Sequence, residues 1–176
     1  MPIYYRDFII RPWEEGDRWI AAQVIQEVLA EYNLRWEPDD ADREVLAVEQ
    51  FYLQTQGEFW VIEQNNQIVG TSGYYPINRD DFPGKAAEIR KMYLLPSARG
   101  QGLGRFLLQS LESAIASQGC EIIWIKTATI RKEAISLYES SGYQLIDGTT
   151  TSRCDRTYFK ILKTYNKLFL RPGQRH

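Results

Sequence analysis

The chain has 176 residues, of which 44% are hydrophobic and 25% are charged, and its formal net charge is −2 at pH 7. This length suits one well-buried core, and the small net charge argues against a protein that coats nucleic acid, because such proteins need a basic excess to displace counterions. No apolar run approaches the roughly 20 residues that span a bilayer, and charges interrupt the N-terminal segment, so we expect neither a membrane span nor a signal peptide.

The first elements predicted along the chain are a strand and two helices. An extended apolar run over residues 7–13 indicates the strand, and apolar spacing over 14–33 indicates a helix with Asp17 as its N-cap. An acidic, turn-rich loop follows at 33–43. After it, apolar residues recur at helical spacing and predict the second helix: Val45, Val48, Phe51 and Tyr52.

The middle of the chain has the pattern of strands. Residues 58–64 and 67–77 predict two strands joined by a hairpin turn at Asn65–Asn66, because strand-like runs flank a turn-forming pair. Residues 78–85 have the composition of a turn. A third strand is expected over 86–95, where the run ends at a proline.

Helices and strands alternate in the last part of the chain. The expected elements are a helix over 104–119 that stops at Gly119, a strand over 121–127, a short helix over 132–142 capped by Gly142, and strands over 143–149 and 156–163. The strand at 86–95, the helix after it and the strand at 121–127 form one β-α-β unit, which should be right-handed with parallel strands.

The predicted order is therefore β-α-α-β-β-β-α-β-α-β-β, which is an α/β fold built on a mixed, α+β-type sheet. No repeat or linker interrupts this order. We expect a single domain over residues 1–176, with its core from about 7 to 163 and a C-terminal extension over 164–176.

The stretch RGQGLGR, residues 99–105, places three glycines where a helix begins. The first N–H groups of a helix are unpaired and carry partial positive charge, and glycines let the backbone approach an anion closely. Arg99 and Arg105 flank the turn and can add charge-assisted hydrogen bonds. The stretch therefore predicts a diphosphate site made mainly of main-chain donors.

The glycine spacing narrows the choice of diphosphate. A Walker A loop needs lysine and then serine or threonine after its last glycine, but Gly104 is followed by Arg105. The dinucleotide pattern Gly-x-Gly-x-x-Gly fails in both registers, because its last glycine falls on Arg105 or Leu107. The pattern that fits is Arg-x-x-Gly-x-Gly over residues 99–104.

Two longer stretches carry a family resemblance. YLLPSARGQGLGRFLLQSL is similar to the acetyl-CoA-binding motif of the GNAT superfamily of N-acetyltransferases, and AISLYESSGYQLI resembles the helix and strand that follow in that superfamily. The motif pair spans residues 88–146, and the order of elements agrees from residue 7 to about 163. The resemblance implies a GNAT-like fold whose central mixed sheet is splayed at the cofactor cleft.

The resemblance also implies where acetyl-CoA lies. Its pantetheine arm would pair with the strand that splays from 121–127, through the backbone of Met92, Tyr93 and Leu94. Its pyrophosphate would take the glycine-rich turn: Arg99, Gly100, Gln101, Gly102, Leu103, Gly104 and Arg105. Arg131 stands where many members carry an asparagine, and two interpretations stay open for it: a contact with coenzyme A phosphates, or a solvated arginine at a helix start.

Several reaction routes are excluded by the rarer residues. The single histidine is His176, the last residue, which removes hydrolases and zinc enzymes that need an internal imidazole. Neither Cys120 nor Cys154 has a candidate activating base nearby in the sequence, so we expect free, structural thiols and no covalent acetyl-enzyme. The few cysteines indicate a reducing, cytoplasmic setting, and we expect no metal. Direct transfer in a ternary complex is the predicted route.

Tyr138 is the candidate general acid. Its phenol, with a pKa near 10, can donate a proton to a departing thiolate whose thiol has a pKa near 8.5. The structural alternative is that Tyr138 only packs one face of the helix over 132–142.

Glu88 is the candidate general base, acting directly or through a water. Strand alternation predicts that Glu88, Arg90 and Met92 share one face of the strand, and that Ile89, Lys91 and Tyr93 share the other. The alternative is a surface ion pair of Glu88 with Arg90 or Lys91, which would contribute little. A main-chain N–H near Met92 is the expected oxyanion donor.

The acceptor site is less defined by the sequence. An acidic set in the loop over 33–43 offers attraction for a cationic amine, and four aromatic residues offer a pocket wall: Asp39, Asp40, Asp42, Trp36, Tyr74, Tyr75 and Phe82. The alternatives are that the aspartates are solvated, with Asp40 or Asp42 capping the next helix, and that the aromatic residues belong to the core.

The leading functional prediction is an acetyl-CoA-dependent N-acetyltransferase, whose partners are acetyl-CoA and an amine acceptor, without nucleic acid or membrane. A catalytically silent acyl-CoA-binding or sensing module is the alternative, motivated by the departure at Arg131. A dinucleotide-dependent enzyme of another class is a third possibility, which the failed glycine spacing disfavours. Since dimers are common in the resembled family, a homodimer is among the expected assemblies.

Overall fold

A computed structural model describes residues 1–146, 151 and 153–162 of the chain. Within these residues the strands form one eight-stranded sheet in the order β1-β2-β3-β4-β5-β6-β8-β7, and β5 and β6 are its parallel pair. The strands are β1 Ile3–Tyr5, β2 Phe8–Pro12, β3 Glu58–Gln64, β4 Gln67–Ile77, β5 Ala86–Leu94, β6 Ile122–Thr127, β7 Gln144–Ile146 and β8 Arg156–Ile161. The predicted mixed sheet is confirmed. The predicted extension over 164–176 lies outside the described residues.

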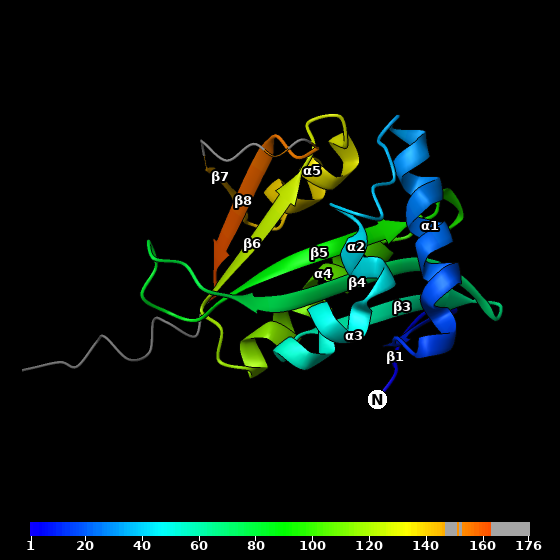
Figure 1. Cartoon of the computed structure of the whole chain (residues 1–176), viewed down its shortest axis with the longest axis horizontal. Helices are drawn as coiled ribbons and strands as arrows, with labels where there is room; N and C mark the ends of the chain where they lie inside the picture. The colour runs from blue at the N-terminus through cyan, green and yellow to red at the C-terminus, as the bar shows by residue number, and fades with distance from the viewer. Residues whose placement is uncertain (147–150, 152, 163–176) are drawn as a thin grey trace, which may run out of the picture.

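Helices cover both faces of this sheet (Figure 1). They are α1 Arg18–Glu31, α2 Arg43–Leu46, α3 Val48–Phe51, α4 Leu103–Ser117 and α5 Lys132–Ser140. Because side chains alternate along a strand, β3 contributes to two core layers. Trp60 and Ile62 pack with α4 on one face, while Phe59 and Val61 pack with α1 on the other.

Two elements differ from the sequence prediction near the N-terminus. Strand β1 was not predicted; it pairs with β2 through a tight turn in which Arg6 has a φ of 53°. The predicted cap Asp17 makes no side-chain bond to α1, and its carboxylate instead accepts from the Glu14 N–H at 2.8 Å. A short 3₁₀ turn therefore precedes α1, and Asp17 closes that turn.

The second predicted helix is two separate turns. Ala47, between α2 and α3, has φ −137° and ψ 48°, which lies outside the helical region and interrupts the hydrogen-bond ladder. The predicted hairpin at Asn65–Asn66 is confirmed, since both residues have positive φ angles of 52° and 61°, as the tight turn between twisted strands requires.

The parallel pair β5–β6 separates partway along its length. The two strands pair from Ala86 opposite Ile122 to Ile89 opposite Ile125, but β5 then continues to Leu94 without β6. Figure 1 shows the two strands diverging below α5. The predicted splay is therefore present, and one edge of β5 beyond Ile89 has no strand beside it.

A bulge in β5 changes which side chains share a face. Its register against β4 shifts between Thr71 and Gly73, and Lys91 has a positive φ of 51°. Beyond the bulge the alternation is reversed. Met92 joins Ile89 in the core beneath α4, while Tyr93 packs in the core beneath α1. The prediction that Met92 shares a face with Glu88 was wrong, because simple alternation does not include a bulge.

An ion cluster holds this bulge. Lys91 Nζ donates to the Ala41 carbonyl and to Asp42 Oδ1, each at 2.7 Å. Asp42 is fully buried and also accepts two hydrogen bonds from the Arg153 guanidinium, at 2.6 and 2.8 Å. Burial alone would raise the pKa of Asp42, but the bonds from Arg153 and Lys91 outweigh burial and lower the pKa.

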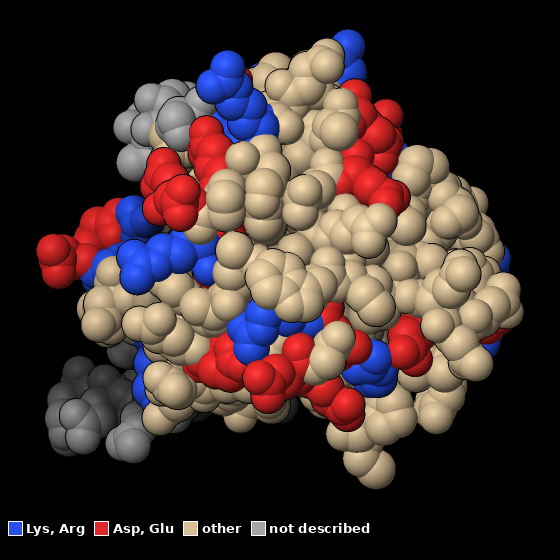
Figure 2. All heavy atoms as spheres, turned by 45° about the vertical axis from the view of Figure 1, so that its right-hand side comes forward, with Lys and Arg blue, Asp and Glu red and all other residues tan. Residues whose placement is uncertain are grey.

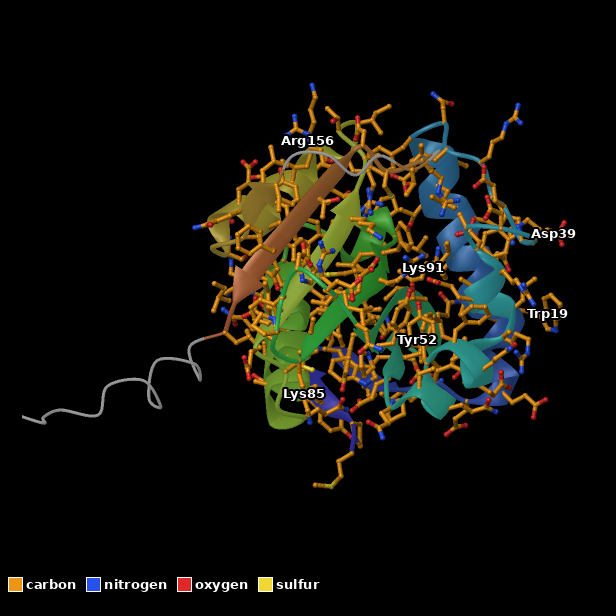
Figure 3. All side chains as sticks on the ribbon, turned by 60° about the vertical axis from the view of Figure 1, so that its left-hand side comes forward. Trp19, Asp39, Tyr52, Lys85, Lys91 and Arg156 are labelled. Atoms are coloured by element: carbon orange, nitrogen blue, oxygen red, sulfur yellow. The ribbon has the colours of Figure 1, made fainter. Side chains whose placement is uncertain are left out.

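These contacts decide between the roles that the sequence left open for Asp42, which were capping the next helix and attracting a cationic amine. Its side chain makes no capping bond to α2, and its charge is taken up by the two cations, so it neither caps the helix nor attracts a substrate. Figure 3 shows Lys91 between β5 and the α1–α2 layer, whereas Asp39 projects outward.

We predict that Asp42→Ala lowers the free energy of unfolding by about 3–5 kcal/mol at pH 7, because it leaves two cations buried without their partner. Asp39→Ala, in the same loop but exposed, should change it by less than about 0.5 kcal/mol. Because the pKa of Asp42 is lowered in the folded protein, its contribution is present above a pH of about 4 and is lost as the pH falls further. Urea unfolding at pH 7 and at about pH 3 measures both effects. If Asp42→Ala lowered the free energy of unfolding as much at the lower pH as at pH 7, this prediction would be contradicted.

Candidate active site

The glycine-rich turn forms a cradle of free main-chain donors at the start of α4. Gly100 and Gly102 have positive φ angles of 74° and 81°, a conformation that favours glycine. Among the described residues, no acceptor bonds the N–H groups of residues 100–105. Unpaired N–H groups at a helix N-terminus are suited to an anion.

Strand β1 braces this turn from the outside. Tyr5 Oη donates to the Gln101 carbonyl at 2.8 Å, and the Tyr5 ring stacks on Phe106 with 4.5 Å between centroids. A Cβ atom on Gly102 would lie 2.6 Å from Tyr5 Oη. Glycine is therefore favoured at position 102 for two reasons: the φ angle there is positive, and Tyr5 Oη leaves no room for a Cβ atom.

A pocket of about 260 Å³ lies between this turn, the splayed part of β5 and α5. It brings together seven residues that the sequence singled out: Met92, Leu94, Arg99, Gly100, Gly104, Arg131 and Tyr138. Tyr32 and Glu133 also line it and were missed, because Tyr32 arrives from α1 with no local motif. We refer to this cavity as the donor pocket.

Four singled-out residues of the turn do not line the donor pocket: Gln101, Gly102, Leu103 and Arg105. The Leu103 side chain is buried in the core, so only its main chain faces the turn. Arg105 Nη2 donates to Ser140 Oγ at 2.8 Å. Arg99 does line the pocket, but its guanidinium forms two hydrogen bonds with Glu31 of α1, at 2.8 and 2.9 Å. Both arginines therefore already have partners within the protein.

Arg131 is not a solvated side chain. Its guanidinium lies 4.6 Å from the centroid of the Tyr93 ring, and its Nη2 donates to the Met92 carbonyl at 3.3 Å. The Nε atom is buried and has no partner among the described residues. The solvated alternative for Arg131 was wrong, and the side chain occupies one edge of the donor pocket.

Tyr138 is both packed and turned to the donor pocket. Its side chain is buried beside the rings of Tyr143 and Tyr158, with centroids 6.0 and 6.1 Å away. Its hydroxyl has no hydrogen-bond partner among the described residues. Burial raises the pKa of Tyr138, so the phenol keeps its proton at neutral pH.

Glu88 lies in a second cavity of about 270 Å³, on the side of β5 that faces α2. It is buried and accepts from Arg90 Nη1 at 2.9 Å, with Lys126 Nζ at 3.6 Å. The ion pair with Arg90 is thus present but is not on the surface, while Lys91 bonds Asp42 instead. We refer to this cavity as the acceptor pocket, after the role that the sequence predicts for Glu88.

The candidate acceptor residues of the sequence are mostly elsewhere. Asp40 lines the acceptor pocket, whereas Asp39 is exposed and Asp42 is buried behind it. The four aromatic residues pack into the core clusters, and none is among the described residues that line the acceptor pocket: Trp36, Tyr74, Tyr75 and Phe82. The core alternative is confirmed for this set.

The two pockets meet at one contact. Tyr93 lines the acceptor pocket and Arg131 lines the donor pocket, and the guanidinium lies over the ring. Glu88, the candidate proton acceptor, lines the pocket that includes Tyr93, and Tyr138, the candidate proton donor, lines the pocket that includes Arg131. Such a pair can remove a proton from one reactant and supply one to another.

Charge is mixed over the surface. Figure 2 shows acidic and basic side chains interspersed on one face of the molecule. In the part of the chain that the structure describes, no group of three or more histidine, cysteine, aspartate or glutamate side chains is placed to hold a metal ion. A search of the same residues finds no helix with the length and apolarity of a membrane span.

Comparisons with known proteins agree with this geometry. The family model described as the acetyltransferase (GNAT) family matches residues 22–143. The uncharacterized N-acetyltransferase YjgM of Escherichia coli K12 is 36% identical over 129 residues, which are 72% of this chain and 75% of that protein.

Solved structures show the same fold at low identity. A GNAT-family acetyltransferase from Staphylococcus aureus Mu50 superposes with a TM-score of 0.80 at 21% identity, covering 89% of this chain and 99% of that one. YncA of Salmonella typhimurium, determined with its cofactor acetyl-CoA, superposes with a TM-score of 0.67 at 20% identity, covering 88% of this chain and 92% of that one.

The two left-handed glycines give a matched test of the turn. Gly100→Ala and Gly102→Ala should each lower the free energy of unfolding by about 1–2 kcal/mol for the positive φ, and Gly102→Ala should cost more because of Tyr5 Oη. In a Tyr5→Phe background, which removes that oxygen, the cost of Gly102→Ala should fall to that of Gly100→Ala. Urea denaturation of the set measures this; equal costs in both backgrounds would show that Tyr5 does not constrain the turn.

Proposed function

The chain belongs to the acetyltransferase (GNAT) family, and on that basis we propose that it moves an acetyl group from acetyl-CoA directly to a primary amine while both substrates are bound. The observation that carries the proposal is the pairing of a splayed β5 edge with a turn of unpaired N–H groups. A thioester arm and a diphosphate are the two ligand parts that such an arrangement fits.

The donor would be held largely by main chain. Its pyrophosphate would take the N–H groups of residues 100–105, where the dipole of α4 favours negative charge. Its pantetheine arm would lie along β5 beyond Ile89, as an added strand. The Met92 carbonyl there now accepts a long bond from Arg131, so the arginine would release or share it when the donor binds.

The acceptor amine would lose a proton to Glu88, directly or through a water, because an alkyl ammonium has no lone pair with which to attack. The amine nitrogen then bonds to the thioester carbonyl carbon, and a main-chain N–H near Met92 would stabilise the oxyanion. When the oxyanion collapses, the C–S bond breaks and the sulfur takes the proton of Tyr138. The amide nitrogen and the protonated Glu88 each release a proton to solvent, and the phenolate of Tyr138 regains one from it, so that one proton is released in each turnover.

One observation favours the silent acyl-CoA-binding alternative. Arg131 donates to the Met92 carbonyl, a group of β5 that the pantetheine would use, and it stands where the family resemblance leads us to expect an asparagine. Thiol release from acetyl-CoA in the presence of an amine panel separates the two functions. Donor binding without release for any amine would support the silent module.

We expect acetyl-CoA to raise the melting temperature, since a ligand at 100 times its dissociation constant adds about 2.7 kcal/mol to the folded state. Gly102→Asp should abolish the shift by placing a carboxylate beside the pyrophosphate, while Gly102→Asn, of the same shape without the charge, should retain most of it. Differential scanning fluorimetry measures all three proteins. If wild-type protein gave no shift at millimolar acetyl-CoA, the donor site proposed here would be wrong.

Tyr138→Phe should lower kcat by roughly 10²–10⁴, the usual contribution of a positioned acid, and leave the acetyl-CoA thermal shift intact. Tyr143→Phe is the matched control, because Tyr143 is also buried, lies 6.0 Å from Tyr138 between ring centroids and does not line the donor pocket. Steady-state thiol release with an accepted amine gives the comparison. An equal loss in both variants would indicate packing rather than proton donation.

A further inference from the structure

The acceptor pocket carries more basic than acidic side chains. Among the described residues that line it, four are basic and two are acidic: Arg90, Lys91, Lys126, Arg153, Asp40 and Glu88. The sequence had suggested an acidic site for a cationic amine. A surplus of basic side chains does not fit that suggestion, so the pairing of these charges matters for the acceptor.

Three of the four cations are already paired with buried carboxylates. The pairs are Arg90 with Glu44 and Glu88, Lys91 with Asp42, and Arg153 with Asp42. Three cations thus face three carboxylates, and their charges largely cancel. These groups build the wall of the pocket, and their hydrogen bonds to one another are short, at 2.6–2.9 Å.

Lys126 is the cation that stands outside these hydrogen-bonded pairs. Its ammonium lies 3.6 Å from Glu88 Oε2, beyond hydrogen-bond length, and Glu88 already accepts from Arg90. No other described residue bonds or pairs with Lys126 Nζ. Its side chain is 31% exposed, so its charge is open to the pocket without being buried.

The position of Lys126 in the sheet explains why it faces the acceptor. The last paired residues of the parallel strands are Ile89 and Ile125, so Lys126 is the first β6 residue beyond the pairing. It lies where the two strands diverge and points to the same face as Glu88, which pairs across the strands with Trp124. Glu88 and Lys126 are therefore neighbouring opposite charges at the mouth of the splay.

Resting on the function proposed above, we infer that the acceptor is a zwitterion: a free α-amino acid or a close derivative that keeps its carboxylate. Its ammonium pairs with Glu88 and its carboxylate with Lys126. The two protein charges are 3.6 Å apart, which matches an acceptor whose own charges stand on adjacent carbon atoms rather than at the ends of a long chain. A carboxylate on Lys126 also draws that cation away from Glu88, which then has an oxygen for the amine proton.

The same charges disfavour other amines. A polyamine or aminoglycoside would bring a second ammonium toward Lys126, and like charges in a partly enclosed site repel. A peptide N-terminus has an amide where the amino acid has a carboxylate, so it would leave Lys126 unpaired. The charge arrangement therefore separates the free amino acid from each of these alternatives.

The test compares acceptors that differ only at the carboxylate. The full-length protein is assayed for thiol release from acetyl-CoA with the standard L-amino acids, with their carboxamides and with the corresponding decarboxylated amines. The carboxamide is the decisive member, because its amine is less basic and more of it is neutral, so it would be the better acceptor if the carboxylate played no part. We expect kcat/KM for the acid to exceed that for the carboxamide at least tenfold.

Substitution of Lys126 tests whether this side chain causes the preference for the acid over the carboxamide. Lys126→Met should lower the acid-to-carboxamide ratio of kcat/KM at least fivefold, chiefly through the KM of the acid, and Lys126→Arg should restore part of the ratio. Lys85→Met is the matched control, because Lys85 is an exposed lysine immediately before β5 that does not line the acceptor pocket, and it should leave the ratio unchanged. Figure 3 shows Lys85 well away from Lys91.

Each outcome decides a separate point. The zwitterion inference is overturned, while acetyl transfer stands, in either of two cases. In the first, wild-type protein has a kcat/KM for carboxamides or decarboxylated amines as high as for the acids. In the second, Lys126→Met lowers kcat/KM equally for all three kinds of acceptor.

If no amine releases thiol, the proposed enzymatic function fails. Calorimetric titration of the amino acids into protein saturated with coenzyme A then tests the zwitterion inference alone. Binding that Lys126→Met weakens at least tenfold supports it, and the absence of binding overturns it.

Discussion

The left-handed bulge at Lys91 is the constraint on which the rest of the site depends. A lysine with a positive φ costs about 1–3 kcal/mol, and the contacts of its ammonium with Asp42 and Ala41 offset that cost. Lys91 lies two residues after Ile89, the last residue of β5 that pairs with β6. The bulge turns Met92 toward α4 and Tyr93 toward α1, so the strand presents different side chains to the two pockets.

The same cluster joins parts of the chain that are distant in sequence. Asp42 comes from the loop before α2, Lys91 from β5 and Arg153 from the segment before β8, and the carboxylate bonds both cations. The acceptor pocket is built on these bonds, because Lys91 and Arg153 are part of its lining. Long-range ion pairs therefore shape this pocket, whereas the cradle of N–H groups beside the donor pocket is formed by the backbone of one short turn.

This difference explains which parts of the fold and of the site could be predicted from the sequence. Strands β3 and β4 agree with the predicted bounds, since alternation and an Asn–Asn turn are local signals, and the glycine-rich turn was recognisable for the same reason. The bulge, the role of Asp42 and the lysine at position 126 were not recognised, because each depends on partners that approach only in the folded chain. Strand β1 was missed because three residues carry too little pattern. The catalytic roles of Glu88 and Tyr138 stay predictions, although each residue lines one of the two pockets.

The backbone origin of the cradle at residues 100–105 has an evolutionary consequence. A binding surface made of peptide N–H groups is preserved through most amino-acid substitutions, because the main chain does not change, provided that the glycines which shape it are kept. The acceptor pocket has no such protection, since one replacement at Lys126 alters the charge at its mouth. A lineage carrying this scaffold can thus exchange one acceptor amine for another while it inherits the acetyl-CoA side unchanged.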